Sequence, residues 1–272
     1  MPTYRLDLEY DGTKFAGWQV QASGRTVQGV LLDALRGIVG QRDLDLQGAG
    51  RTDAGVHALA QVASLRTKRA VDPHRLLAEL ERTLPADLAV FEIRAAHPRF
   101  HARHDALARV YRYQITRRRS AFGKRTTWWV PEPLDARRMA AAARAFEGRH
   151  DFRAFARRAG EAESTVVEVA ACRVATLDEF TLIRIVGSHF LWNQVRRMVA
   201  SLVAVGRGEA APDDVPDWLD GRAAPPAGAA PAAGLFLEAV RYAGERAELP
   251  PLVPVGPPLP ASRGASLAAG VR

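Results

Sequence analysis

The sequence predicts an α+β fold built from two mixed halves that meet near residue 107. The chain has 272 residues, of which 47% are hydrophobic, enough for one large domain or two modest ones. Strand-like and helix-like segments are interspersed, and their connections do not suit a doubly wound parallel sheet. We therefore expect an N-terminal half (1–107), a C-terminal half (108–248) and a disordered, proline-rich tail (249–272).

The N-terminal half opens with a strand, because residues 4–10 alternate between apolar and charged side chains with a period of two. Thr26 is expected to cap a helix whose apolar residues recur on one face as far as Val39. Asp72-Pro73 has the cap and first-turn proline of a second helix, which ends near Pro85. Shorter strands are expected near three further segments: 44–46, 61–66 and 90–93.

The C-terminal half repeats this mixture. A strand is expected over 108–115, followed by an alanine-rich helix from Asp135. Residues 166–174 and 180–186 read as two strands joined by a hairpin turn at Asp178. A long amphipathic helix is expected over 190–205, then an Ala/Pro/Gly loop and a last strand over 235–242.

The charge pattern favours a polyanionic partner. The formal net charge is +8, and nine Lys/Arg lie between Arg99 and Arg125 against the single acid Asp105. A second basic group follows in the helix and loop beyond: Arg144, Arg149, Arg153, Arg157 and Arg158. Clustered cations suit a surface that tracks phosphates. The alternative is a general arginine richness that serves solubility.

Membrane, secreted and metal-binding classes are not indicated. No apolar run approaches the roughly 20 residues that span a bilayer, and the N-terminus has no signal-peptide segment. The single cysteine, Cys172, excludes an intramolecular disulfide, and no zinc-ligand spacing is present. We therefore expect a cytoplasmic protein with no metal.

The segment most typical of a functional site is Gly48-Ala-Gly-Arg-Thr-Asp-Ala-Gly-Val-His-Ala58, in which three glycines flank Arg51 and Asp53. A phosphate-binding loop fits poorly, because no Gly-Lys-Ser/Thr follows and Asp53 stands where the last glycine of Gly-x-Gly-x-x-Gly belongs. From the residues alone, a surface loop with an Arg–Asp pair remains an equal alternative.

This segment resembles the active-site motif of the TruA family, the tRNA pseudouridine synthases of the anticodon stem-loop. Further motifs resemble the family in the same order along residues 4–242: Tyr10-Asp11-Gly12, Gly17-Trp18-Gln19, Leu84-Pro85, Phe100-His101-Ala102-Arg103, Tyr111-Arg112-Tyr113, Val195-Arg196-Arg197-Met198-Val199 and Gly234-Leu235. The resemblance implies two similar halves with largely antiparallel sheets joined around a central RNA-binding cleft. It also implies a homodimer that isomerises uridines 38, 39 and 40 of tRNA without a cofactor.

The resemblance also assigns roles to four residues. Asp53 is the implied catalytic aspartate, Arg51 contacts RNA and helps to extrude the base, and Tyr111 stacks on it. Arg196 is the implied partner of Asp53. It lies roughly 100° from the centre of the apolar stripe of its helix, so it can border a cleft, whereas Arg197 is expected to face solvent or RNA. On pattern alone, a snorkelling arginine is the better reading of Arg196, and a core aromatic is the better reading of Tyr111.

Other residues have less specific signals. RNA contacts are expected from five side chains: His101, Arg103, Arg117, Arg118 and Arg119. His57 either orders the loop around Asp53 or is a satisfied structural histidine. Four departures from the family pattern, Glu81, Asn193, Ala200 and Val167, replace none of the four site residues. The alternatives in function are a pseudouridine synthase acting on ribosomal RNA and a non-catalytic RNA-binding protein.

Overall fold

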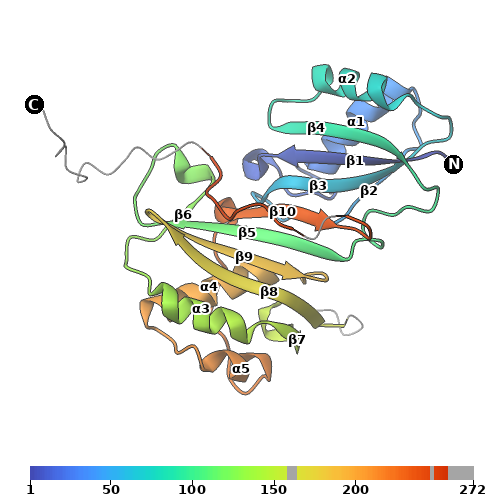
Figure 1. The fold of residues 1–272 in the computed structure, drawn as a ribbon. Helices are drawn as coiled ribbons and strands as arrows, with labels where there is room; N and C mark the ends of the chain where they lie inside the picture. Colours follow the sequence, from blue (N-terminus) through green and yellow to red (C-terminus); the bar gives the residue numbers. More distant parts are fainter. Residues whose placement is uncertain (158–163, 246–247, 257–272) are drawn as a thin grey trace, which may run out of the picture.

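The computed structural model describes residues 1–157, 164–245 and 248–256 and is built around one ten-stranded sheet (Figure 1). The strand order is β4-β1-β3-β10-β5-β9-β8-β7, with β2 paired to β3 and β6 to β5. The strands are β1 (Thr3–Tyr10), β2 (Asp45–Gly48), β3 (His57–Arg66), β4 (Leu88–Ala96), β5 (Ala108–Thr116), β6 (Trp128–Trp129), β7 (Gly148–Asp151), β8 (Val166–Leu177), β9 (Phe180–Gly187) and β10 (Leu235–Arg241).

The sheet is mostly antiparallel, and this confirms the predicted fold class. Among the strand pairs of the described residues, only β3–β10 and β5–β6 are parallel. The last strand, β10, lies between β3 and β5, with Phe236 opposite His57 and Leu237 opposite Tyr111 (Figure 1). Because β10 satisfies backbone groups of strands from both predicted halves, the two sheets are one continuous sheet.

Two helices of the first half begin where the sequence predicts. Thr26 caps α1 (Val27–Val39) by accepting a hydrogen bond from the amide of Gly29. Asp72 caps α2 (Pro73–Thr83) in the same way, with Pro73 in the first turn. Both helices pack on the β1–β4 half of the sheet (Figure 1).

The helices of the second half are α3 (Ala136–Ala145), α4 (Gln194–Arg207) and α5 (Asp214–Leu219). The expected start of α4 at residue 190 is wrong. Asn193 has a φ of 65°, in the left-handed region, so the helix begins only at Gln194. The strands β6 and β7 and the helix α5 were not expected from the sequence. Within the described residues, no helix is both long and apolar enough to cross a membrane.

The beginning of the predicted tail makes specific contacts. Three of its backbone carbonyls, those of Pro250, Val253 and Val255, accept hydrogen bonds from the polar side chains of β5 and β9: Arg184, Arg112 and Gln114. Arg112 and Arg184 also bind the buried carboxylate of Glu238. The side chains of Arg112, Gln114 and Arg184 need hydrogen-bond acceptors on this face of the sheet, and the carbonyls of residues 250–255 supply them. The rest of the predicted tail, 257–272, lies outside the described residues.

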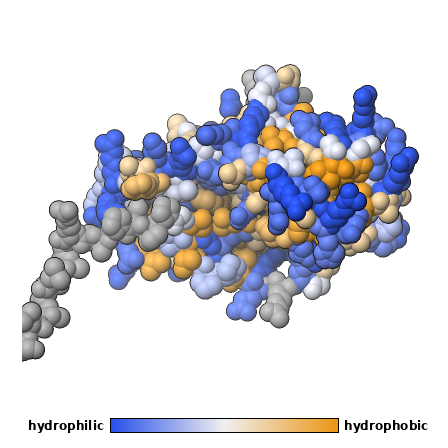
Figure 2. All heavy atoms as spheres, turned by 90° about the horizontal axis from the view of Figure 1, so that it is seen from above, coloured by the Kyte–Doolittle hydropathy of each residue, from blue (hydrophilic) through white to orange (hydrophobic). Residues whose placement is uncertain are grey.

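The molecular surface is mixed in character. Seen from above, hydrophilic residues surround several smaller hydrophobic areas (Figure 2). One apolar side chain exposed to solvent is Phe91 on the edge strand β4. Single exposed apolar residues of this kind are ordinary for a folded protein.

Candidate active site

The loop that carries Asp53 connects β2 to β3 and is fixed from both sides. A Cβ on Gly48 would lie 2.5 Å from the Trp18 ring, so this position requires glycine. The hydroxyls of Tyr10 and Thr52 are hydrogen-bonded at 2.8 Å, and the Gln61 side chain donates to the Gly50 carbonyl at 2.8 Å. Asp53 therefore stands on a loop held by buried polar contacts.

The structure brings Asp53 to Arg196 of α4. Arg196 Nη1 lies 3.6 Å from Asp53 Oδ2, and the two side chains are only 20% and 27% exposed. The guanidinium is oriented by two further acceptors, the Ala230 carbonyl at 2.6 Å and Asn193 Oδ1 at 3.1 Å. An arginine fixed in this way presents a directed positive charge to the carboxylate.

Opposing effects act on the Asp53 carboxyl. Burial raises its pKa above the ordinary value for aspartate, since removal from water disfavours the charged form. Arg196 is the strongest of the groups that lower this pKa, followed by the side chain of Trp192 and the charge of Arg157. The net result is a raised pKa on a carboxyl that still has cationic partners.

Tyr111 lies next to the loop that carries this carboxylate. It sits on β5, is 8% exposed, and packs edge-on against Phe190 with ring centroids 5.3 Å apart. Its hydroxyl is 3.8 Å from the place that a Cβ on Gly50 would occupy, so it faces the loop. Burial raises the Tyr111 pKa, and the charge of Asp53 adds to that rise. The ring is thus a neutral wall of the site.

Arg51 is placed differently from Arg196. Its side chain is exposed and, in the described part of the chain, forms no hydrogen bond or ion pair. Of the two arginines that the sequence offers as partners of Asp53, only Arg196 pairs with it. Arg51 is a cation exposed to solvent two residues away.

The expectation for Arg197 is wrong. Its Nη1 donates to the carbonyls of Ala154 and Ala156, at 3.3 and 3.0 Å, and the side chain is half-buried. These carbonyls belong to the short turn Arg153–Phe155 and to Ala156, the residue that ends it. The turn packs against α4, and its carbonyls need donors there. Arg197 therefore fixes this turn to the helix and is only partly open to solvent.

Part of the basic cluster is internal. Arg112 and Arg109 are buried, and Arg109 donates to the carbonyls of Ala49 and Ser188, both at 2.8 Å. Arg109 thereby ties the start of the Asp53 loop to the end of β9. The strand period places Arg109 on the same face as Tyr111, but it does not predict this role.

The expected RNA-contacting residues lie on the surface and do not pair with Asp53. Arg103, Arg117 and Arg119 are exposed. Arg118 pairs with Glu179 at 3.2 Å. In the remaining residue, His101, Nδ1 accepts a hydrogen bond from the backbone N–H of Arg103 at 3.1 Å, within a turn. Arg158 lies outside the described residues.

His57, at the start of β3, is a fully satisfied histidine. Its Nδ1 accepts the Gly12 amide at 3.1 Å, and its Nε2 therefore donates to the Arg125 carbonyl at 2.7 Å. The ring stacks on Phe236 of β10 at 4.7 Å. Burial lowers the His57 pKa, which fits a neutral ring. His57 thus links the end of the Asp53 loop to elements of the second half.

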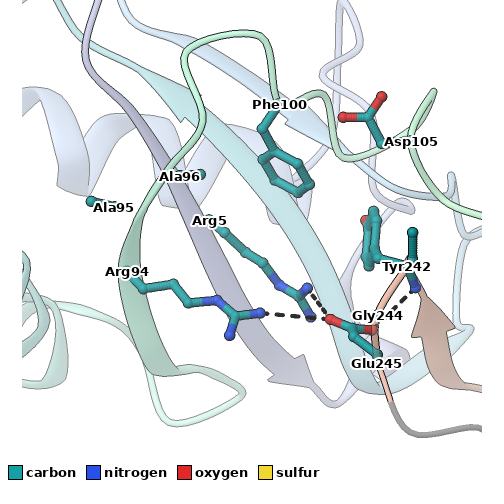
Figure 3. A pocket seen from close by; sticks show the side chains of 10 residues that line it. Arg5, Arg94, Ala95, Ala96, Phe100, Asp105, Tyr242, Gly244 and Glu245 are labelled. Carbon is teal, nitrogen blue, oxygen red and sulfur yellow. Dashed lines mark hydrogen bonds and ion pairs between the residues drawn. The ribbon is translucent and has the colours of Figure 1, made fainter.

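A separate surface pocket of about 450 Å³ lies away from this site (Figure 3). Arg5 and Arg94 both reach Glu245, the latter at 3.6 Å, and Arg5 also lies over the Tyr242 ring at 4.7 Å. Three of its charged side chains, Arg5, Arg94 and Glu245, are therefore paired with one another. In the described residues, no group of three or more His, Cys, Asp or Glu is arranged to hold a metal ion.

Comparison with known proteins agrees with this arrangement. A family model described as tRNA pseudouridine synthase matches residues 8–105 and 142–243. A "tRNA pseudouridine synthase A" of Pelobacter propionicus is 42% identical over 245 residues, which cover 89% of this chain and 100% of the relative. One from Solidesulfovibrio magneticus is 45% identical over 258 residues, covering 89% and 92%.

A solved Cbf5-Nop10-Gar1 complex contains a chain that is 10% identical, with a TM-score of 0.35, over 71% of this chain and 46% of the other. That likeness is slight, and the assignment rests on the family match and the relatives. The family match covers both Asp53 and Arg196. The chain belongs to the tRNA pseudouridine synthase family.

Proposed function

We propose that this protein isomerises uridine to pseudouridine at positions 38, 39 and 40 in the anticodon arm of tRNA, with Asp53 as the catalytic carboxylate. Family membership and relatives named tRNA pseudouridine synthase A support the reaction. The observation that carries the assignment of Asp53 is its pairing with Arg196 beside the buried ring of Tyr111. No cofactor or metal takes part in this proposal.

The site fits the chemistry of the reaction. Isomerisation breaks the N-glycosidic bond, turns the uracil and joins it again through carbon, so redox chemistry and a group donor are unnecessary. It requires one ionised carboxylate in a partly dry pocket, which is stable only when paired. Arg196 supplies that pairing charge, whichever atom of the uridine Asp53 attacks.

The base must leave the stem to reach Asp53. Extrusion loses stacking energy, and an aromatic wall offsets part of that loss. Tyr111 provides the wall, and the exposed Arg51 stands on the same loop as Asp53, where it can contact the phosphates around the extruded nucleotide. Neighbouring uridines are accepted because such contacts read shape and charge more than base edges.

The proposal also gives a role to the cations on the surface. Arg103, Arg117, Arg118 and Arg119 contact the tRNA backbone, and His101 shapes the turn that presents Arg103. The protein acts as a homodimer in the cytoplasm, where its tRNA substrate is found. The net charge of +8 supports a polyanionic substrate.

Site mapping tests the substrate assignment. Purified protein, with a chelator and no added cofactor, is incubated with tRNA carrying uridines at 38–40 and, separately, with a ribosomal RNA fragment. Carbodiimide mapping then reports the position of each pseudouridine. We expect product at 38–40 of the tRNA alone. Product on ribosomal RNA alone would overturn the substrate, and tight tRNA binding without product would indicate a binding protein.

A further inference from the structure

Arg109, the second residue of β5, is a buried cation without a carboxylate partner. Its side chain belongs to a residue that is only 8% exposed, and within the described ranges of the chain it forms no ion pair. A buried charge is costly unless other polar groups compensate for the water that it has lost. The groups that bind Arg109 therefore indicate what this charge does in the fold.

Backbone carbonyls take up all of the hydrogen-bonding capacity of Arg109. A guanidinium has five N–H donors. Nε and Nη2 donate to the Ala49 carbonyl at 3.2 and 2.8 Å, and Nη2 also donates to the carbonyl of Arg103. Nη1 donates to the carbonyls of Ala106 and Ser188, at 3.1 and 2.8 Å. Because no donor is left for a substrate, Arg109 acts on its surroundings through these four carbonyls.

Two of the carbonyls belong to segments that carry residues of the candidate active site. Ala49 opens the loop between β2 and β3 on which Asp53 lies. Ser188 opens the connection from β9 to α4, in which Phe190 packs edge-on against Tyr111. One guanidinium therefore holds the loop of the carboxylate to the segment that packs on the tyrosine ring.

The other two carbonyls belong to the connection between β4 and β5, which carries an expected RNA contact. The carbonyls of Arg103 and Ala106 accept from the same guanidinium, whereas the side chain of Arg103 is exposed. Arg109 thus fixes the backbone from which Arg103 reaches solvent, and it fixes that backbone relative to the loop of Asp53. A phosphate bound by Arg103 would then lie at a set distance from the carboxylate.

We propose that Arg109 is a positioning residue that holds the Asp53 loop, the Arg103 turn and the start of the β9–α4 connection in one arrangement, so that tRNA bound at Arg103 presents its uridine to Asp53. The inference rests on the proposed function, in which Asp53 is catalytic and Arg103 contacts the tRNA backbone. Such positioning matters, because a misplacement of about 1 Å can slow a reaction by about a hundredfold.

Arg109→Lys is the direct test. Lysine keeps the positive charge, but its three donors on one nitrogen cannot serve four carbonyls of three segments. Single-turnover pseudouridine formation is measured with the protein in saturating excess over tRNA, together with the Kd for tRNA and the Tm. We expect the rate to fall by at least about tenfold. The Kd should rise by only about threefold, since one phosphate contact is disturbed. A native rate would overturn the proposal, even with a lower Tm.

Arg112→Lys is the matched control. Arg112 is also a buried arginine of β5, but it donates to the Val253 carbonyl and to Glu238, and neither partner belongs to the candidate site. We expect a lower Tm with a native single-turnover rate. If Arg112→Lys slowed the reaction as much as Arg109→Lys, the loss of any buried arginine from this strand would explain the result, and the proposal would fail.

A double-mutant cycle with Arg103 separates positioning from a general loss of stability. Arg103→Ala is made in the native protein and in Arg109→Lys, and the Kd for tRNA is measured for each. If Arg109 positions Arg103, the substitution should change log Kd in the Arg109→Lys background by about half of its effect in the native protein. Equal effects in the two backgrounds would show that Arg109 does not position Arg103.

Two further variants keep the result interpretable. If Arg109→Lys does not fold, Arg109→Met replaces it, because an unbranched apolar chain fills the site without a buried charge. Its rate should fall by at least as much, and a native rate would overturn the proposal. Asp53→Asn is assayed in parallel. If it is inactive while the Arg109 variant is native-like, only this inference fails. If Asp53→Asn is active, the catalytic assignment fails as well.

Discussion

At the scale of single residues, the site depends on a balance at one carboxyl group. Burial raises the Asp53 pKa, whereas Arg196 supplies the largest opposing effect through its charge. A fully solvated aspartate would ionise more easily, but its charge would be spread into water and less available to a bound uridine. The fixed guanidinium of Arg196 offsets part of the effect of burial, so the partly buried carboxylate remains available for reaction.

This balance predicts a pH effect of Arg196→Ala. Burial raises the Asp53 pKa and the Arg196 cation lowers it, so removal of the cation raises this pKa further. The acid limb of kcat/KM therefore moves to higher pH. Activity at neutral pH should fall by roughly a hundredfold, as for loss of one oriented charge partner. The measurement is kcat/KM for tRNA isomerisation over an acidic to neutral pH series.

Arg51→Ala is the matched control, because Arg51 lies on the loop of Asp53 but does not pair with it. We expect weaker tRNA binding and an acid limb that stays at the native pH. The account would be contradicted if Arg196→Ala left the acid limb in place, or if Arg51→Ala moved it.

At the scale of elements, capping and periodicity predicted most helices and strands. Thr26, Asp72 and Asp135 each cap the helix that the sequence places after them. The signals are local, because each cap and its first turn lie within a few residues. The start of α4 could not be predicted in this way, since the left-handed Asn193 carries no local signal as strong as a glycine.

The sequence indicated the main residues of the site, but it did not indicate all the contacts that hold them in place. The resemblance to the family indicated Asp53, Arg196 and Tyr111. In the structure Asp53 pairs with Arg196, and the Tyr111 hydroxyl faces the loop that carries Asp53. The burial of Arg109 and the contacts of its guanidinium depend on which strands and turns become neighbours across the sheet. Such contacts are set by tertiary packing, which composition and periodicity do not specify.

The loop that carries Asp53 should be sensitive to volume at Gly48. Gly48→Ala would place a Cβ 2.5 Å from the Trp18 ring, and overpacking of this kind costs about 1–3 kcal/mol. We expect the Tm to fall by several degrees in thermal denaturation, with lower activity. In Gly50→Ala the nearest atom would be 3.8 Å away, so its Tm should stay close to native. Equal Tm values for the two variants would argue against a packed loop.

At the scale of the whole molecule, β10 joins the two halves. Asp53 precedes β3 and Tyr111 lies on β5, and β10 pairs with both strands (Figure 1). The site is therefore assembled across a strand that comes late in the chain. This arrangement fixes the distance between the loop that carries Asp53 and the ring of Tyr111, because backbone ladders hold strands at a constant spacing.

The charge of the whole molecule predicts strongly salt-dependent tRNA binding. In Arg117→Ala/Arg119→Ala, two exposed cations are lost, and the slope of log Kd against log salt should decrease by about 2. Arg222→Ala is the control, since Arg222 already pairs with Asp217 and Asp220. A double variant with the native slope would mean that this loop does not contact the tRNA.

The central claim, that Asp53 is the catalytic carboxylate of a tRNA pseudouridine synthase, is tested most directly by Asp53→Asn. Asparagine keeps the shape of the side chain and removes the charge. Single-turnover pseudouridine formation on tRNA is measured for the native protein and the variant, together with the Kd for tRNA. We expect the native protein to form pseudouridine, and the variant to bind tRNA with similar affinity and form none. An Asp53→Asn variant with the native rate would contradict the account.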